Sequence, residues 1–169
     1  MITPAYVVTM ARYNAWQNRQ LTTLLEPLPE RELTKDRGAF FGSILRTVNH
    51  LLWGDMIWMS RIHPTYPAPG VSFSDSVDLC PTIADWGAQR FRCDGRIRLW
   101  AEGVGQLDLT GNLTWTSASN GQRIVEPLAL CIVHMFNHQT HHRGQVHAML
   151  TGAGIAAPIS DLVDLPEDF

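Results

Sequence analysis

The amino-acid sequence predicts an all-α protein, a four-helix bundle whose helices run up, down, down and up. Apolar residues recur at helical spacing in four segments of roughly 20 residues each. The link between the first two segments is short, whereas residues 64–81 form a long, proline-rich crossover between the second and the third. Short links favour antiparallel neighbours, and a long crossover lets the helices on either side of it run parallel. A short β-hairpin pattern precedes the fourth segment.

The first two helices have recognisable start and stop residues. Thr3-Pro4 starts the first helix as an N-cap followed by proline at the first helical position, and the helix runs to about Glu26. We expect residues 30–42 to form a charged connector. Ser43 then caps the second helix, which ends at His63-Pro64 because the residue before a proline is disfavoured in the helical region.

The second half of the chain contains two more helices and the hairpin. Thr82 starts the third helix, which runs to about Gly103. Residues 112–125 hold two β-prone runs around Ser119-Asn120-Gly121, which predicts a hairpin with an Asn-Gly turn. The fourth helix begins at Pro127 and is closed by two glycines, Gly152 and Gly154. The acidic tail, residues 156–169, shows no clear pattern.

The composition indicates an ordinary globular protein. Its 169 residues suffice for a single domain, residues 1–169, with a full hydrophobic core. A net charge of −3 and an isoelectric point near 6.1 argue against a nucleic-acid-binding protein. The three cysteines form no C-x-x-C pattern, so neither a disulfide framework nor a thiolate zinc site is indicated. We recognise no signal peptide and no membrane-spanning run, and therefore expect a cytoplasmic protein with no membrane partner. Lys35 is the one lysine among 13 basic residues, and the others are arginines. This preference for arginine is typical of a G+C-rich bacterial genome.

Four of the seven histidines lie between residues 134 and 142, in the fourth predicted helix. His138 and His142 are spaced i, i+4, so their side chains lie on one face of the helix and can bind one metal ion. His134 cannot complete a set of three with them, because eight residues of helix rise about 12 Å and metal–nitrogen bonds are about 2 Å long.

A third ligand must therefore come from another segment. His63 lies at a helix end before Pro64, where we expect it to be exposed. His50 lies inside the second helix, and Gly54, one turn on, would leave space beside it. We therefore favour His50. A histidine pair at this spacing also occurs by chance in helices that bind no metal, so the local sequence alone leaves both interpretations open.

Two segments carry a family resemblance. They are Asn49-His50-Leu51-Leu52-Trp53-Gly54-Asp55-Met56-Ile57-Trp58 and Phe136-Asn137-His138-Gln139-Thr140-His141-His142-Arg143-Gly144-Gln145. Together they resemble the DinB family, the DinB/YfiT-like group of small metal-binding bundles and not the polymerase of the same name. The resemblance extends to residues 13–18 and 36–43, and so covers most of the chain. It implies metal ligands at His50, His138 and His142.

The resemblance also implies a chemistry. Three histidine ligands leave a fourth metal position open, which is typical of catalytic and not of structural sites. Imidazole suits zinc, nickel, iron and copper; we expect zinc or nickel, with iron as a further option. Characterised relatives include thiol-dependent S-transferases, which implies a low-molecular-weight thiol cofactor and a small-molecule substrate. Relatives commonly form dimers, so a homodimer is expected. Two alternatives stay open: a metal-dependent hydrolase, and a non-catalytic metal-binding or stress-response dimer.

Four further residues are candidates for the surroundings of the metal or for a substrate pocket. Asp55 lies in the apolar stripe of the second helix, where a carboxylate must be paired. It either pairs with an arginine such as Arg143 or accepts a hydrogen bond from a ligand histidine. Arg46, one turn before His50, either holds an anionic group or is solvated. Asn14 is a candidate to face the cleft.

Overall fold

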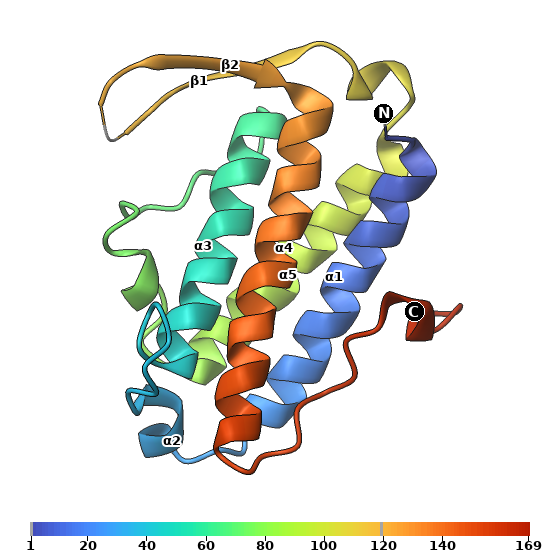
Figure 1. The fold of residues 1–169 in the computed structure, drawn as a ribbon. Helices are drawn as coiled ribbons and strands as arrows, with labels where there is room; N and C mark the ends of the chain where they lie inside the picture. The colour runs from blue at the N-terminus through green and yellow to red at the C-terminus, as the bar shows by residue number, and fades with distance from the viewer. Residues whose placement is uncertain (1, 119) are drawn as a thin grey trace.

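The structure of the protein, a computed structural model, describes residues 2–118 and 120–169. Helices α1 and α5 run in one direction and α3 and α4 in the opposite one, so the up-down-down-up arrangement is confirmed (Figure 1). α1 packs mainly against α4, and α3 mainly against α5. The four long helices of the bundle are α1 Pro4–Leu25, α3 Ile44–Ile62, α4 Ile83–Gly103 and α5 Leu128–Gly152.

The helices begin where the sequence predicts, because local hydrogen bonds fix their first turns. The hydroxyl oxygens of Thr3, Ser43 and Thr82 each accept a hydrogen bond from the backbone N–H three residues on, at 3.2, 3.3 and 3.1 Å. Each satisfies a backbone donor that the helix itself leaves without a partner. At the other end of α3, His63 has extended backbone angles before Pro64, which confirms the predicted stop.

The connector after α1 is more ordered than the sequence predicts. It contains a short helix, α2 Glu30–Thr34, which the charged pattern did not reveal. Its one buried residue, Leu33, is 3 % exposed and joins the core of the bundle. A turn closed by a β-bridge between Ala39 and Gly42 then leads into α3. It places Phe41 beside the start of that helix.

The long crossover between α3 and α4 also has a defined course. It contains the 3-10 helix η1, Ser76–Asp78, which packs against α3. The buried Asn49 side chain on α3 holds this segment by donating to the backbone carbonyls of Val77 and Cys80, at 3.0 and 2.9 Å. This contact fixes Ser76 close to the middle of α3.

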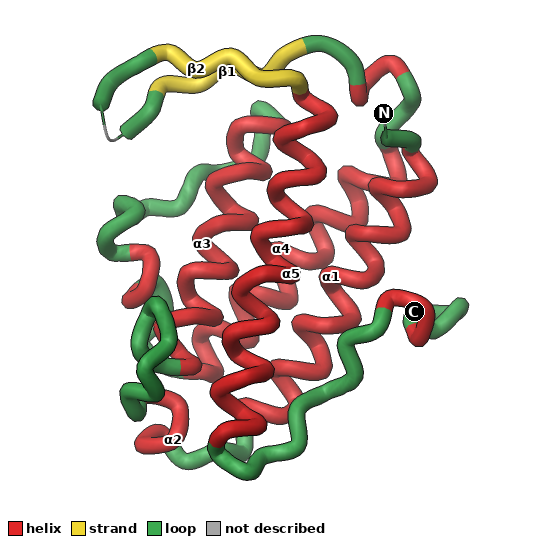
Figure 2. The backbone as a smooth tube through the Cα atoms, in the orientation of Figure 1, coloured by secondary structure: helices red, strands yellow, loops and turns green. Residues whose placement is uncertain are grey.

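The hairpin crosses one end of the bundle. Strands β1 Asn112–Thr116 and β2 Arg123–Pro127 pair antiparallel and lead directly into α5 (Figure 2). Trp115 on β1 packs edge-to-face on Trp58 of α3, with ring centroids 5.5 Å apart. Ser119 in the predicted Asn-Gly turn lies outside the described residues.

The C-terminal tail lies along α1 and contains the 3-10 helix η3, Leu162–Asp164 (Figure 1). Side chains of α1 hold it by donating to tail carbonyls: Tyr13 to Ser160 at 2.5 Å and Gln17 to Ile159 at 2.8 Å. The tail thus adds an ordered layer that no periodicity in its sequence indicated.

The core of the bundle is apolar and receives side chains from all four long helices. Fully buried examples are Val7, Leu25, Val48, Leu52, Ile97, Ile132 and Leu150. The indole of Trp86, also fully buried, donates to the carbonyl of Val48 at 2.8 Å and so ties α4 to α3. Within the described residues, no helix combines the length and the apolar character that crossing a membrane requires.

Candidate metal centre

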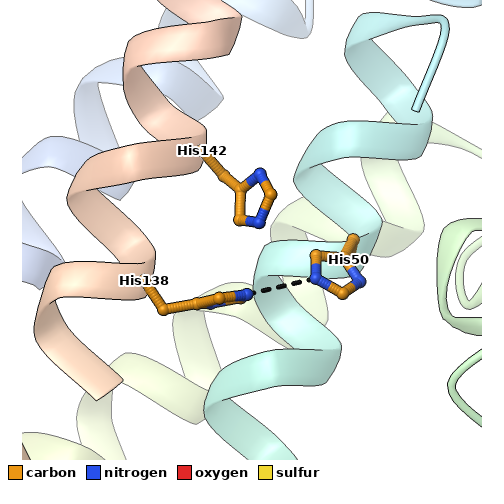
Figure 3. A group of neighbouring side chains, drawn as sticks. All are labelled: His50, His138 and His142. Carbon is orange, nitrogen blue, oxygen red and sulfur yellow. Dashed lines mark hydrogen bonds between the residues drawn. The ribbon is translucent and has the colours of Figure 1, made fainter. Parts of the chain in front are cut away.

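Three histidines meet between α3 and α5. His50 comes from α3, and His138 and His142 come from successive turns of α5 (Figure 3). One ring nitrogen from each lies within 4.8 Å of the other two, and His50 Nε2 lies 3.1 Å from His138 Nε2. Two nitrogens bound to one tetrahedral zinc ion lie about 3.3 Å apart. The donor set therefore fits a metal ion, and His50, His138 and His142 could hold one.

Close packing of α3 on α5 makes this approach possible. A Cβ atom at Gly54 would stand 2.7 Å from His138 Cε1 and 3.0 Å from His138 Nδ1, so only glycine leaves room for this ring. The space that Gly54 was predicted to leave beside His50 is occupied by the imidazole of His138 from the opposite helix, whose Nε2 lies 3.1 Å from His50 Nε2.

Two hydrogen bonds orient the rings. His142 Nδ1 donates to the amide oxygen of Gln145 at 2.7 Å, which leaves Nε2 of His142 free as a metal ligand. His50 Nδ1 and the hydroxyl of Ser76 are hydrogen-bonded at 3.0 Å. Ser76 is fully buried in η1 and could not be found from the sequence, because the crossover that carries it has no periodic pattern.

The three rings have the protonation state that a metal requires. Burial, together with the neighbouring His142 imidazole, lowers the pKa of His50 to about 4. Burial and the surrounding imidazoles lower the pKa of His138 to about 3, and burial also lowers the pKa of His142. A metal binds the neutral imidazole, so all three are in the binding form at neutral pH.

Aromatic side chains border the site. The Phe41 ring centroid lies 4.2 Å from that of His50 and 5.3 Å from that of His142. The rings of Phe73 and Trp53 lie 5.5 and 6.0 Å from His50. Phe73 is 59 % exposed, so the border reaches the molecular surface. Phe41 and Phe73 lie in connecting segments, and neither was singled out from the sequence.

Asp55 does not serve the histidines. Its carboxylate forms an ion pair with Arg90 on α4 at 2.8 Å and accepts hydrogen bonds from Asn14 at 3.0 Å and Gln139 at 2.6 Å. Asp55 therefore pairs with an arginine, as predicted, but this is Arg90 and not Arg143, and among the described residues its carboxylate accepts no hydrogen bond from a ligand histidine. The sequence did not identify Arg90 as the partner, because Arg90 lies on another helix. The rotation of that helix about its axis is set by tertiary packing.

The remaining candidates belong to the same buried polar network or lie outside it. Arg143 donates to the amide oxygens of Asn14 and Gln139 and, in the described part of the chain, forms no hydrogen bond with any of the three histidines. Asn14 is 1 % exposed within this network, so the prediction that it faces a cleft is wrong. The Arg46 side chain is half exposed, with its nearest carboxylate, Asp78, 4.0 Å away, which agrees with a solvated arginine.

Neither the other histidines nor the cysteines belong to the three-histidine cluster. The rings of His134 and His141 nevertheless lie close to it, 6.1 Å from His138 and 4.8 Å from His142. His134 is exposed and packs edge-to-face on Trp58, and the Nδ1 of His63 is hydrogen-bonded to Thr65 at 2.9 Å. Burial raises the pKa of Cys80 to about 11 and that of Cys93 to about 12. Cys131 is also buried, with a raised pKa. All three are therefore protonated thiols at neutral pH and poor nucleophiles.

Comparisons with known proteins agree with this fold. The sequence model of the DinB family matches residues 1–168. A curated relative, Protein DinB of Bacillus subtilis (strain 168), is 24 % identical over 165 residues, which cover 92 % of this chain and 91 % of the relative. The crystal structure of a DinB-like protein from Bacillus cereus ATCC 10987 superposes with a TM-score of 0.54 at 19 % identity, covering 87 % of this chain and 90 % of that one.

Proposed function

The chain belongs to the DinB family, and from its three-histidine cluster we propose that it is a metal-dependent enzyme that joins a low-molecular-weight thiol to a small electrophile. The observation that carries the proposal is the convergence of three neutral imidazoles within 4.8 Å, two of which are oriented by hydrogen bonds to Ser76 and Gln145. Three protein ligands leave a metal position for an exogenous group, as in catalytic sites. Zinc or nickel suits this donor set best, with iron as a further option.

When bound, a divalent metal would stabilise the thiolate form of the thiol, which is the nucleophilic form. The sulfur attacks an electrophilic carbon, and the new S–C bond forms as the bond to the leaving group breaks. The leaving group departs with its electron pair, and the thiol proton passes to solvent. His50, His138 and His142 would hold the metal, while Ser76 and Gln145 keep two of the rings in position.

Two features favour an external thiol, the first over a cysteine of this chain and the second over activated water. None of the three cysteines of the chain is ionised at neutral pH, so the nucleophile must be supplied from outside. Among the described residues, no carboxylate contacts the three histidines, and Asp55 is fully engaged with Arg90, Asn14 and Gln139. A hydrolase that uses a carboxylate as its general base lacks one here. Metal-dependent hydrolysis remains the alternative that the experiment below must distinguish.

The aromatic border supports an apolar electrophile. Phe41, Trp53 and Phe73 present ring faces and edges beside His50, and such surfaces gain free energy by covering apolar groups. The Trp53 indole also donates to the carbonyl of Val71 at 3.0 Å, which keeps the crossover against α3. The border would shield the reacting carbon from water.

A conjugation assay tests the proposal. Protein loaded in turn with zinc, nickel and iron(II) is incubated with a panel of bacterial thiols and alkylating electrophiles, and product is followed by mass spectrometry. We expect metal-dependent product with the wild type and with His134→Ala, and none with His138→Ala. A fully metal-loaded protein that forms no conjugate would support the non-catalytic binder, and hydrolysis of an ester panel without conjugation would support the hydrolase.

Two further parts of the proposal concern the setting of the enzyme. We place it in the bacterial cytoplasm, where small thiols stay reduced. We also propose a homodimer, supported by exposed apolar residues on α4: Phe91 is 82 % exposed and Leu99 is 72 % exposed. Sedimentation equilibrium should give twice the chain mass of 19.0 kDa, and a monomer would refute the dimer.

A further inference from the structure

A second site lies on another face of α5. A cavity of about 320 Å³ opens between α1, α5 and the C-terminal tail, and we call it the Arg143 cavity. Arg143 and His147, one helical turn apart, line it from α5, Tyr13 and Gln17 line it from α1, and Ser160 lines it from the tail. These α5 residues lie about 100–180° around the helix axis from His138 and His142. The cavity therefore faces α1, whereas the three histidines face α3.

Arg143 is a buried cation that no carboxylate of the described residues contacts. It is 7 % exposed, and its NH1 donates only to the neutral amide oxygens of Asn14 and Gln139. Its Nε and NH2 groups donate no hydrogen bond to any of the described residues. The neighbouring Arg90, by contrast, pairs with both Asp55 and Asp94, at 2.8 and 2.7 Å. A buried guanidinium gains most from an anion that engages its free edge with two parallel hydrogen bonds.

The rest of the lining suits such an anion. No acidic residue is among the described residues that line the cavity, and its ionisable groups are Arg143, His147 and Tyr13. Leu21 and Pro158 add apolar surface. The Tyr13 hydroxyl and the Gln17 amide donate to tail carbonyls, so the wall that the tail forms is fixed.

We propose that the Arg143 cavity binds a small monocarboxylate, whose two oxygens accept from the guanidinium of Arg143 while its apolar body lies against Leu21 and Pro158. The planar fork of arginine matches a carboxylate, and a volume of about 320 Å³ admits a body of about the size of a benzene ring. The site does not depend on the function proposed for the three histidines, because it shares no residue with them.

Gly144 offers a way to fill the cavity without touching the charge. It lines the cavity, and a Cβ atom added there would meet no heavy atom within 4 Å. Gly152, on the same helix, is equally open and does not line the cavity. Gly144→Leu and Gly152→Leu are therefore a matched pair, and both should fold, since leucine is a better helix former than glycine.

The experiment is titration calorimetry of the full chain with benzoate, with its neutral analogue benzamide and with inorganic phosphate, before and after treatment with a chelator. We expect saturable benzoate binding, about tenfold or more tighter than that of benzamide, because a hydrogen bond between charged groups is stronger than one to a neutral amide. Binding should survive chelation, persist in Gly152→Leu and fall about tenfold or more in Gly144→Leu and in Arg143→Lys.

Each opposite result would overturn the proposal. Equal affinity for benzoate and benzamide would remove the anion site, and tighter binding of phosphate would refute a carboxylate. Loss of benzoate binding on chelation would place the carboxylate on the metal. Unchanged affinity in Gly144→Leu, with circular dichroism showing a folded protein, would place the benzoate outside the cavity.

Discussion

Gly54 of α3 lies directly against the imidazole of His138 of α5, so closely that a Cβ atom at position 54 would stand 2.7 Å from His138 Cε1. The position of the ring therefore depends on a hydrogen atom where every other residue has a carbon. This contact links the packing of two helices to the geometry of the candidate metal centre.

The first prediction follows from this contact. Gly54→Ala should push the His138 ring out of line with His50 and lower metal affinity by about 10–100-fold, the range seen when a group supporting a metal ligand is lost. Competition with a chromophoric chelator measures the affinity. Gly95→Ala on α4, where an added Cβ meets no heavy atom within 4 Å, is the control and should bind metal normally. Equal affinities in the two variants would contradict the role of Gly54.

The second prediction concerns the ligand set. We expect one divalent metal per chain, no binding in His138→Ala or His142→Ala, and affinity lower by orders of magnitude in His50→Ala, because each removes one of three converging donors. His134→Ala and His63→Ala should keep full stoichiometry. Elemental analysis after dialysis measures all five variants. Full occupancy of His50→Ala at low free metal would refute its assignment.

The third prediction is a pH dependence of the metal-free protein. The pKa of His138 falls from 6.5 to about 3 on folding, so between these values the unfolded chain binds a proton that the folded one does not. Its contribution to the free energy of unfolding is therefore present above about pH 6.5 and is lost as the pH falls toward about 3. Asp94 acts in the opposite direction, because burial raises its pKa to about 6.

The wild type and the His138→Asn variant both contain Asp94, so its contribution cancels when the two proteins are compared. Urea unfolding of the metal-free proteins at about pH 7 and about pH 4.5 should show the wild type losing more stability on acidification than the variant. Parallel losses would mean that His138 titrates normally in the folded protein.

The fourth prediction is that the metal serves chemistry and not folding. The core is apolar and spans all four long helices, so chelation should leave the helical circular dichroism unchanged. The free energy of unfolding should fall only by the contribution of metal binding to the folded state. This contribution is about 2.7 kcal/mol when the free metal concentration before chelation is about 100 times Kd. Thiol-transfer activity should vanish with the metal and return on its addition. Loss of helix on chelation would show a structural site instead.

The fifth prediction concerns the buried network. Asp55→Asn should lower the free energy of unfolding by about 3–5 kcal/mol, because it leaves the buried guanidinium of Arg90 without one of its two carboxylates. Asp78→Asn, at a 71 % exposed side chain 4.0 Å from Arg46, should cost at most about 1 kcal/mol. Denaturant unfolding of both variants measures the two free energies. Equal losses of stability would contradict the larger effect expected of the buried ion pair.

Local patterns predicted most of the fold. Helix caps at Thr3, Ser43 and Thr82, the stop at Pro64 and the spacing of His138 and His142 are encoded within a few residues, and each agrees with the structure. The long crossover between α3 and α4 was enough to predict that these two helices run parallel.

Contacts between segments distant in the sequence could not be predicted in the same way. Asp55 pairs with Arg90 because of how α4 is rotated toward α3, and no spacing within one helix reports that rotation. Ser76, Phe41 and Phe73 reach the histidines from connecting segments that have no period to analyse. The sequence therefore predicted where the three histidines lie more reliably than what surrounds them.

The attachment of the C-terminal tail has an evolutionary consequence. The donors are side chains of α1, and the acceptors are carbonyl oxygens that every amino acid possesses: those of Ile159, Ser160, Pro166 and Glu167. Selection can therefore preserve the docked tail by keeping Arg12, Tyr13 and Gln17, while most tail positions drift. Phe169 is the exception, since its ring lies under the guanidinium groups of Arg19 and Arg98 at 5.8 and 5.6 Å.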